Sequence, residues 1–368
     1  MKKNKKVLTI GGATIDTIIK YEEMETLQVH KSNVVNSFLL LEEGAKIEVT
    51  EQERFSGGGA TNAAVSFKKQ GYDVTFFGKV GKDALGERII NELNELDIDT
   101  NNVQFSNTFG TANSYVVPSL QGDRTVFAYR GANTNLLESD IPESAIAQSD
   151  FVYVTSLSKN SAARLPKIVQ IANNYNIPVA INPGISQLVL GSSFVKSALS
   201  GIDILILNYD EAKVFMTSLI SSDESIKDMM AHGEGSPAES LLDASVEYQD
   251  VSFSLRHFFK EVLGLGPKIV VVTNGSEGVY VGTTESLYFH ESIKCDVLNT
   301  LGAGDAFGST FVGSIYAGLD VPVAIKHGLI NSGSVISFSD AKTGLLDWNQ
   351  IKAKVSDIDA SLLKITDW

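Results

Sequence analysis

The chain of 368 residues is long enough for one large α/β domain or two smaller ones. Its 43% apolar and 20% charged residues are typical of a globular protein with a substantial core. With 44 acidic and 30 basic residues the net charge is −14, which argues against a nucleic-acid-binding protein and a membrane-surface protein. The single cysteine, Cys295, excludes an internal disulfide and indicates a reducing compartment.

The N-terminus does not have the pattern of a targeting segment. Residues 1–6 are basic, as at the start of a signal peptide, but the apolar run 7–10 is broken by Gly11 and ended by Asp16. That run is too short for a signal core. No stretch approaches 18 apolar residues, so the sequence predicts no membrane span, and we expect a cytoplasmic protein.

Strands and helices alternate along most of the chain. Short apolar runs predict strands at residues 7–10, 74–77, 151–155, 179–181, 204–207 and 269–272. Apolar residues three or four apart predict helices at residues 60–70, 83–96 and 162–174. Strands separated by helices are typical of a parallel sheet that is covered on both faces. The sequence therefore predicts an α/β fold in three layers around a mostly parallel sheet.

Three segments depart from this alternation. Residues 17–55 and 107–133 contain short, exposed-type strands, which we interpret as a small subsidiary sheet that forms a lid. Residues 221–250 are rich in Ser, Asp and Glu and are interpreted as a surface insertion. We expect residues 1–368 to form a single domain that carries these additions.

The most distinctive stretch is 299–307, Asn-Thr-Leu-Gly-Ala-Gly-Asp-Ala-Phe. The apolar residues between 293 and 298 predict the end of a strand before it. Apolar side chains three or four apart predict a helix that opens at or just before Asp305 and runs to about residue 318. The stretch is therefore expected to be a strand, a glycine-rich turn and a helix.

Such a turn suits phosphate chemistry. The first N–H groups of a helix have no internal partner and lie at the positive end of the helix dipole. Gly302 and Gly304 omit the side chains that would keep a phosphoryl group away from those donors, and Asp305 could take the proton of an incoming hydroxyl. The alternative is an ordinary glycine turn with an Asp cap.

Further polar signals follow other predicted strands. The glycine turn 57–59 precedes a helix with Asn62 in its early turns, and Asp16 follows the first strand, where a carboxylate could accept two sugar hydroxyls. Asn208 and Glu211 follow another strand and could orient a hydrated Mg²⁺. A flexible connection, a turn residue and a helix start are the respective alternatives.

The order of these motifs resembles the ribokinase-like (PfkB) carbohydrate kinases over nearly the whole chain. The matching motifs are the Gly…Asp strand end (11–16), the glycine turn with Asn (57–62), Gly-Lys-Asp-Ala-Leu-Gly (81–86), Asn-x-x-Glu (208–211), the turn 273–278 and Gly-Ala-Gly-Asp (302–305). The last motif combined with the upstream glycine turn is quite specific. The chain lacks a Gly-x-x-x-x-Gly-Lys-Ser/Thr loop, as expected for this family, which binds ATP differently.

The resemblance implies a ribokinase-like fold and roles for individual residues. Asp305 would be the catalytic base, and the N–H groups of Gly302, Ala303 and Gly304 would form the anion hole for the γ-phosphoryl group. The nucleotide site would be lined by Asn208, Glu211, Thr273, Gly275, Gly278 and Asn331, with Glu211 supporting Mg²⁺ through water. The acceptor would be held by Asp16, Gly58, Gly59, Asn62 and Arg130.

The chain departs from the family pattern at two places. Asn299 stands where the family usually has an Asp that some relatives tie to a monovalent-cation site, so potassium activation is doubtful. The glycine turn lacks the lysine that ribokinases and phosphofructokinase-type members carry, which makes ribose and sugar phosphates less favoured substrates. Arg130 could pair with a carboxylate on the acceptor, and a surface salt bridge is the alternative.

We therefore predict an ATP- and Mg²⁺-dependent kinase that phosphorylates a hydroxyl of a small sugar or sugar-like molecule. A nucleoside kinase of the same fold is one alternative. A non-catalytic nucleotide- or sugar-binding regulator is another; the intact Asp305 argues against it, while Asn299 keeps it open. The lid of many relatives also builds a dimer interface, so a homodimer is the expected assembly, without nucleic-acid or membrane partners.

Overall fold

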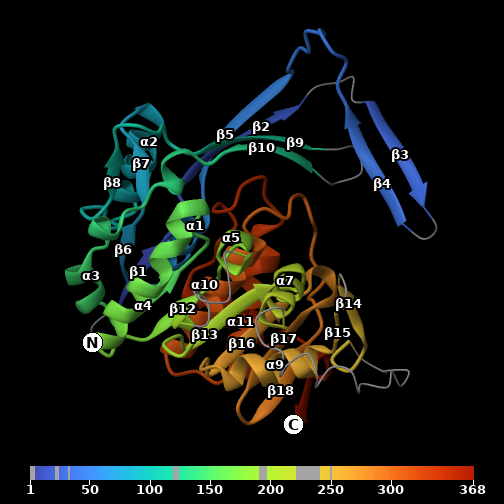
Figure 1. Cartoon of the computed structure of the whole chain (residues 1–368). Coiled ribbons are helices and arrows are strands. Elements are labelled where there is room, and N and C mark those ends of the chain that lie inside the picture. Colours follow the sequence, from blue (N-terminus) through green and yellow to red (C-terminus); the bar gives the residue numbers. More distant parts are fainter. Residues whose placement is uncertain are drawn as a thin grey trace.

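The computed structural model describes residues 5–20, 25–31, 34–118, 124–189, 197–220, 241–248 and 251–368. A nine-stranded sheet forms its centre, in the order β19-β18-β17-β16-β13-β12-β11-β1-β6 (Figure 1). These strands are β1 (Lys6–Ile10), β6 (Asp73–Phe77), β11 (Phe151–Val154), β12 (Val179–Ile181), β13 (Ile204–Asn208), β16 (Ile269–Thr273), β17 (Val279–Thr283), β18 (Ser286–His290) and β19 (Leu363–Asp367). From β16 to β6 the neighbours are parallel, whereas β17, β18 and β19 run antiparallel.

Helices cover both faces of this main sheet. They are α1 (Gly59–Lys69), α2 (Ala84–Glu95), α3 (Glu143–Ala147), α4 (Leu165–Asn174), α5 (Ile185–Val189), α7 (Tyr209–Ile220), α9 (Leu255–Gly264), α10 (Ala303–Tyr316), α11 (Val321–Val335) and α12 (Trp348–Val355). Side chains alternate between the two faces along each strand. In β11, Val152 and Val154 join one apolar cluster with α4, α7 and α9, while Phe151 and Tyr153 join the other with α1, α10 and α11. The predicted three-layer α/β fold is confirmed.

A second, four-stranded sheet follows directly from the end of β1. Its order is β10-β9-β2-β5, with β2 (Thr14–Lys20), β5 (Glu51–Gly57), β9 (Asn113–Pro118) and β10 (Arg124–Tyr129). The hairpin of β3 (Glu25–Lys31) and β4 (Val34–Leu40) extends from it. Figure 1 shows this small sheet arching over one end of the main sheet, with the hairpin at its far side. The strands predicted within 17–55 and 107–133 are therefore present.

Short elements complete the chain. They are β7 (Lys79–Gly81), β8 (Gln104–Ser106), β14 (Val246–Tyr248), β15 (Val251–Phe253) and the 3₁₀ turns η1 (Gly131–Thr134), η2 (Glu138–Asp140), η3 (Lys159–Arg164), η4 (Gly275–Glu277) and η5 (Ala360–Leu362). Of the expected insertion 221–250, residues 221–240 and 249–250 lie outside the described residues. Among the helices that the structure describes, none is both long and apolar enough to span a bilayer.

The strand predicted just before residue 299 is wrong. The last strand there, β18, ends at His290, and residues 291–299 run without regular structure. The N–H groups of Leu298 and Asn299 both donate to the carbonyl oxygen of Ile336, at the end of α11, so this segment attaches to a helix and not to the sheet. Val297 and Leu298 are 62% and 70% exposed, which explains why their apolar character misled the prediction.

Candidate active site

A pocket of about 270 Å³ lies between the small sheet and the carboxyl ends of the main-sheet strands. We call it the central pocket. It is lined by seven of the residues predicted from sequence, namely Asp16, Gly58, Gly59, Asn62, Arg130, Gly302 and Asp305. They come from β2, the β5–α1 junction, the end of β10 and the start of α10. Parallel strands bring their carboxyl ends to one edge of a sheet, which is where α/β proteins bind ligands.

Asp305, in the first turn of α10, is held by Asn62 of α1. Asn62 Nδ2 donates a hydrogen bond of 2.7 Å to Asp305 Oδ2. Burial raises the pKa of the Asp305 carboxyl above its ordinary value, the Asn62 bond and the charge of Lys342 lower it, and Asp16 raises it. A Cβ atom at Gly59 would lie only 3.1 Å from Asp305 Oδ1, so glycine gives the carboxylate its space. The result is a positioned carboxylate that is more basic than a surface Asp.

Asp16 is the second carboxylate of the central pocket. Ser114 Oγ on the adjacent strand β9 donates a hydrogen bond of 2.5 Å to Asp16 Oδ1. Burial raises the pKa of Asp16, while Ser114 and the charges of Lys342 and Arg130 lower it. A Cβ atom at Gly57 would lie 2.2 Å from Asp16 Oδ2, so any other residue there would displace this carboxylate. The glycine turn thus makes room for this carboxylate as well.

The turn before α10 has the geometry expected of an anion site. Gly302 is the N-cap and has φ of +77°, a left-handed conformation that favours glycine. A Cβ atom at Gly302 would lie 2.5 Å from Cβ of Ala341, whereas one at Gly304 would meet nothing within 4 Å. Gly302 therefore permits the turn, and Gly304 leaves open space beside the helix start, where the N–H of Ala303 makes only a long bond of 3.4 Å to the carbonyl oxygen of Thr300.

Asn208 and Glu211 form a reciprocal cap at the start of α7. The N–H of Asn208 donates to Glu211 Oε2 at 2.9 Å, and the N–H of Glu211 donates to Asn208 Oδ1 at 2.8 Å. Burial raises the pKa of Glu211 to about 7, although its bond to Asn208 opposes this. Glu211 also lines a cavity of about 320 Å³, the side cavity, together with Arg130, Lys159 and Asn182. The pair therefore both caps a helix and reaches a cavity.

The turn after β16 contacts residues that lead into a third cavity, but Thr273, Gly275 and Gly278 do not line that cavity. The turn after β16, which carries Gly275 and Gly278, packs closely, because a Cβ at Gly278 would lie 2.2 Å from the carbonyl oxygen of His290. Residues 291–295, which follow His290, and residues of α11 line a cavity of about 650 Å³. We call it the outer cavity, and Cys295 is one of the residues that line it. Thr273 ends β16, and its Oγ1 donates to the carbonyl oxygen of Leu207 at 3.5 Å.

The structure does not bring Asn331 to the outer cavity. Its neighbour Ile330 lines that cavity, but the Asn331 side chain is fully buried. Asn331 Nδ2 donates to Thr310 Oγ1 at 2.7 Å, and Oδ1 accepts from the N–H of Leu346 at 2.8 Å. Its amide is thus used within the core, because a helix presents successive residues to different sides.

Lys342 is a site residue that the sequence analysis missed. Its Nζ donates a hydrogen bond of 2.6 Å to Oγ of Ser56, the neighbour of the glycine turn. Burial lowers the pKa of Lys342 to about 8, opposed by nearby carboxylates that include Asp16 and Asp305. It lies in the loop after α11 and belongs to no recognisable motif, so no sequence signal could have found it.

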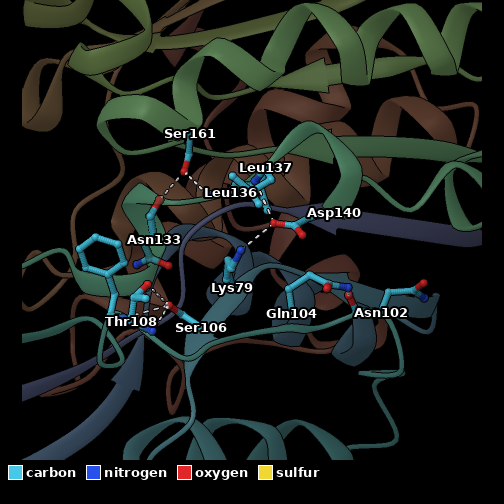
Figure 2. A network of polar contacts seen from close by, with 11 residues as sticks. Lys79, Asn102, Gln104, Ser106, Thr108, Asn133, Leu136, Leu137, Asp140 and Ser161 are labelled. Atoms are coloured by element: carbon cyan, nitrogen blue, oxygen red, sulfur yellow. Dashed lines mark hydrogen bonds and ion pairs between the residues drawn. The ribbon is translucent and has the colours of Figure 1, made fainter.

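A polar network holds the back of the central pocket. The Asn133 amide donates to the carbonyl oxygen of Ala13 at 2.9 Å and accepts from its N–H at 3.2 Å, which fixes the corner between β1 and β2. The carbonyl oxygen of Asn133 accepts from Ser161 Oγ at 2.8 Å, and that hydroxyl oxygen accepts from the N–H of Leu136 at 2.9 Å. Figure 2 shows Ser161 between these two residues. Beside it, Lys79 Nζ pairs with Asp140 Oδ2 at 2.7 Å (Figure 2).

Two contacts tie other elements to the turn before α10. Arg124 of β10 donates from Nη1 to Thr300 Oγ1 at 2.6 Å, which joins the small sheet to the turn. Asn299 Nδ2 donates to the carbonyl oxygen of Ser339 at 2.8 Å, and its Oδ1 accepts from the N–H of Leu301 at 2.8 Å. The Asn299 amide thus bridges two loops.

Comparisons with known proteins find sugar kinases of similar sequence. A ribokinase of Staphylococcus aureus (strain COL) is 26% identical over 291 residues, which cover 76% of this chain and 83% of the relative. The 5-dehydro-2-deoxygluconokinase of Bacillus subtilis (strain 168) is 25% identical over 291 residues, covering 77% and 81%.

Solved structures show the same fold. Arabidopsis thaliana ribokinase complexed with ribose and ATP has a TM-score of 0.73 at 18% identity and covers 97% of this chain and 100% of its own. A nucleoside kinase of Methanocaldococcus jannaschii also has a TM-score of 0.73, at 18% identity, covering 97% and 99%. The sequence matches the family described as pfkB family carbohydrate kinase over residues 4–238 and 251–343. The protein is therefore a phosphotransferase that belongs to the pfkB family of carbohydrate kinases, as its motifs predicted.

Proposed function

We propose that this kinase transfers the γ-phosphoryl group of ATP to a hydroxyl of a small sugar or sugar-like acceptor. The observation that carries the proposal is the contact between Asn62 and Asp305 at the start of α10. It puts a carboxylate of raised pKa at the N-terminal end of a helix, in the pocket that also contains Asp16. The proposed base Asp305, the proposed anion site at the start of α10 and the proposed hydroxyl-binding carboxylate Asp16 therefore lie in one pocket.

In this proposal Asp16 accepts hydrogen bonds from acceptor hydroxyls and so fixes the sugar in the central pocket. Asp305 takes the proton of the attacking hydroxyl as the new O–P bond forms and the bond to the leaving ADP oxygen breaks. The N–H groups of 302–304 donate to the charge on the transferring phosphoryl group. Gly58 and Gly59 keep the floor of the pocket free of side chains.

We place the nucleotide in the outer cavity, with its phosphates toward Gly304. Residues 291–295 line that cavity, and the chain continues from them through residues 296–299 into the turn before α10. Glu211, half-buried near Asp305, offers the hard oxygen ligand that Mg²⁺ prefers, through water. Bound there, Mg²⁺ would neutralise charge on the phosphates.

A nucleoside acceptor is the second candidate because the small sheet gives the pocket an apolar wall. Ile18, Phe55, Val126 and Tyr129 line the central pocket opposite the main sheet. Aromatic and aliphatic side chains of this kind could stack on a nucleobase while Asp16 holds the ribose hydroxyls. A free sugar leaves this wall uncovered, so comparing nucleosides with free sugars separates the two.

The small sheet has the position of a lid, which would exclude water from the phosphoryl group on closing. Its strands β9 and β10 also expose the large apolar side chains Tyr115 and Phe127, and the hairpin exposes Leu27 and Phe38. We propose that these surfaces pair in a homodimer, which light scattering on the full chain would detect. A cytoplasmic location stays a prediction.

The test is ADP release from Mg·ATP with sugars, sugar acids, sugar phosphates and nucleosides, using the wild type and Asp305→Asn. The variant should lose about 10²–10⁴-fold in rate, the usual contribution of a general base. It should still bind ATP, which is measured as protection of Cys295, the only cysteine of the chain, from a thiol reagent. Near-normal turnover by Asp305→Asn would remove this residue from the base role. Silence of the wild type with every acceptor would favour a non-catalytic regulator.

A further inference from the structure

The contact between Asn62 of α1 and Asp305 of α10 has a counterpart one turn further along both helices. Ser66 follows Asn62 by four residues, and Ser309 follows Asp305 by four residues. Ser309 Oγ and Ser66 Oγ are hydrogen-bonded at 2.7 Å. Residues four apart lie on one face of a helix, so the face of α1 that carries Asn62 meets the face of α10 that carries Asp305 at both levels.

This serine pair is fully buried in a layer that is otherwise mostly apolar. Ser66 and Ser309 are both 0% exposed, and the same two helices contribute Phe67 and Phe311 to the apolar cluster around them. Burial of a hydroxyl costs free energy unless it is hydrogen-bonded. A shift of one helix along the other would break the bond between the serines and leave both hydroxyls unpaired. The pair therefore favours one register of α1 against α10.

Further contacts hold the same two helices together at the next turn. A Cβ atom at Gly313 of α10 would lie 2.8 Å from Gln70 Oε1, at the end of α1, so the helices approach closely there. Gln70 Nε2 donates to Ser66 Oγ at 3.0 Å and to Thr310 Oγ1 at 2.8 Å. Tyr72 Oη donates to the carbonyl oxygen of Gly313 at 2.6 Å. Polar contacts thus join α1 and α10 from the base to the far end of α1.

The hydroxyl of Ser309 also reaches the backbone that carries the base. Its Oγ donates a hydrogen bond of 2.6 Å to the carbonyl oxygen of Asp305. A serine commonly bonds to the carbonyl four residues earlier in its own helix, so this bond alone has an ordinary explanation. The bond to Ser66 differs, because it crosses to the helix that carries Asn62. One hydroxyl therefore connects the backbone of Asp305 with the helix whose side chain binds its carboxylate.

We propose that Ser309 is a positioning residue for phosphoryl transfer, which acts through Ser66 to hold α10 in the register at which Asn62 meets the Asp305 carboxylate. The inference rests on the proposed function, because it takes Asp305 as the base. It goes beyond that function by adding a fully buried residue that is not among those lining the central pocket. A displacement of about 1 Å at a reacting group can cost about 100-fold in rate, so such a support matters.

The test compares Ser309→Ala with the matched control Ser314→Ala. Ser314 is also a fully buried serine of α10, but it donates to the carbonyl oxygen of Thr310 at 2.8 Å and lies 2.9 Å from His327 Nδ1 of α11. Each change removes one buried hydroxyl, so both variants should melt at a similarly lowered temperature. Only Ser309→Ala should lower kcat, by about 10- to 100-fold, with KM for acceptor and ATP unchanged.

The pH profile shows whether Ser309 acts through the contact with Asn62. That contact lowers the pKa of Asp305, so loosening it should move the acidic limb of kcat/KM to higher pH, by less than its complete loss in Asn62→Ala. The Ser309→Ala change leaves the charges of the other titratable groups that influence Asp305 in place, namely Asp16 of β2, Lys342 after α11, Glu211 of α7 and Tyr153 of β11.

Two further variants make the test independent of any single protein preparation. Ser66→Ala removes the same bond from the α1 side and should reproduce both the lower kcat and the displaced limb. The double variant Asn62→Ala with Ser309→Ala should match Asn62→Ala alone, because Ser309 acts through a contact that is already lost.

Three results would overturn the proposal. They are an unmoved limb in Ser309→Ala, an equal fall of kcat in Ser314→Ala, and additive effects in the double variant. Asp305→Asn in the same assay reports separately on the proposed kinase reaction. Near-normal turnover by Asp305→Asn removes the base itself, whereas an inactive Asp305→Asn together with an unmoved limb in Ser309→Ala rejects only the positioning role.

Discussion

Replacing Asn62 with Ala tests how the base is tuned. The Asn62 amide donates to Asp305 Oδ2 at 2.7 Å and so stabilises the charged carboxylate, which lowers its pKa. A hydrogen bond to a charged group contributes about 1.5–3 kcal/mol. Loss of this bond removes stabilisation of the charged form and should therefore raise the pKa of Asp305. About 1.4 kcal/mol corresponds to one pKa unit. The expected displacement is about 1–2 pH units.

The sign of the effect on rate follows from the role of the base. Asp305 must be ionised to take a proton, so kcat/KM falls as the pH drops through its pKa. In Asn62→Ala this acidic limb should lie about 1–2 units higher than in the wild type. The assay is coupled ADP release between pH 5 and 9, with each variant's melting temperature measured alongside.

Asn113→Ala is the matched control for this change. Asn113 also lines the central pocket, but its Nδ2 donates to the carbonyl oxygen of Thr111 at 3.1 Å and not to a carboxylate. Its removal should leave the acidic limb in place, whatever it does to acceptor affinity. An unmoved limb in Asn62→Ala, with a lower rate at every pH, would refute the reasoning and confine Asn62 to acceptor binding.

Two further predictions concern the support of the site. The Lys79–Asp140 pair is only 8% and 13% exposed, so Asp140→Ala leaves a buried ammonium unpaired and should lower the free energy of unfolding by about 3–5 kcal/mol in urea titrations. The combined change Lys79→Met and Asp140→Leu should recover most of this loss, and failure to do so would point to another cause. The Asn299 amide already bonds to Ser339 and Leu301. We therefore expect equal turnover in potassium, sodium and tetramethylammonium chloride. Activation by potassium alone would contradict this expectation.

The sequence predicted the main sheet well where burial determines the pattern. Strands β1, β6, β11, β12, β13 and β16 are largely apolar because both of their faces are covered. The antiparallel strands β17, β18 and β19 were not identified. Apolar residues gave a wrong prediction at 297–298, where Val297 and Leu298 are exposed but were interpreted as the end of a strand. The hydrophobicity of a residue does not show whether it packs in a sheet, packs against a helix or lies at the surface.

The candidate site was predictable to the extent that its chemistry lies in compact motifs. Glycine turns and the residues beside them, such as Asn62 and Asp305, have local signatures because a tight turn demands particular residues. Lys342 and Ser114 have none, since they reach the site only through the fold. Asn331 shows the opposite error, because a position in the right helix does not fix the direction of its side chain.

The two carboxylates of the central pocket come from different parts of the molecule, and this has a consequence for the base. Asp16 belongs to the small sheet and Asp305 to the start of α10, so their separation depends on where the small sheet lies. The negative charge of Asp16 raises the pKa of Asp305, and a Coulomb interaction weakens with distance. Lys342, bonded to Ser56 of β5, limits that increase from the same side. The element that brings the hydroxyl-binding carboxylate to the acceptor thus also increases the basicity of Asp305.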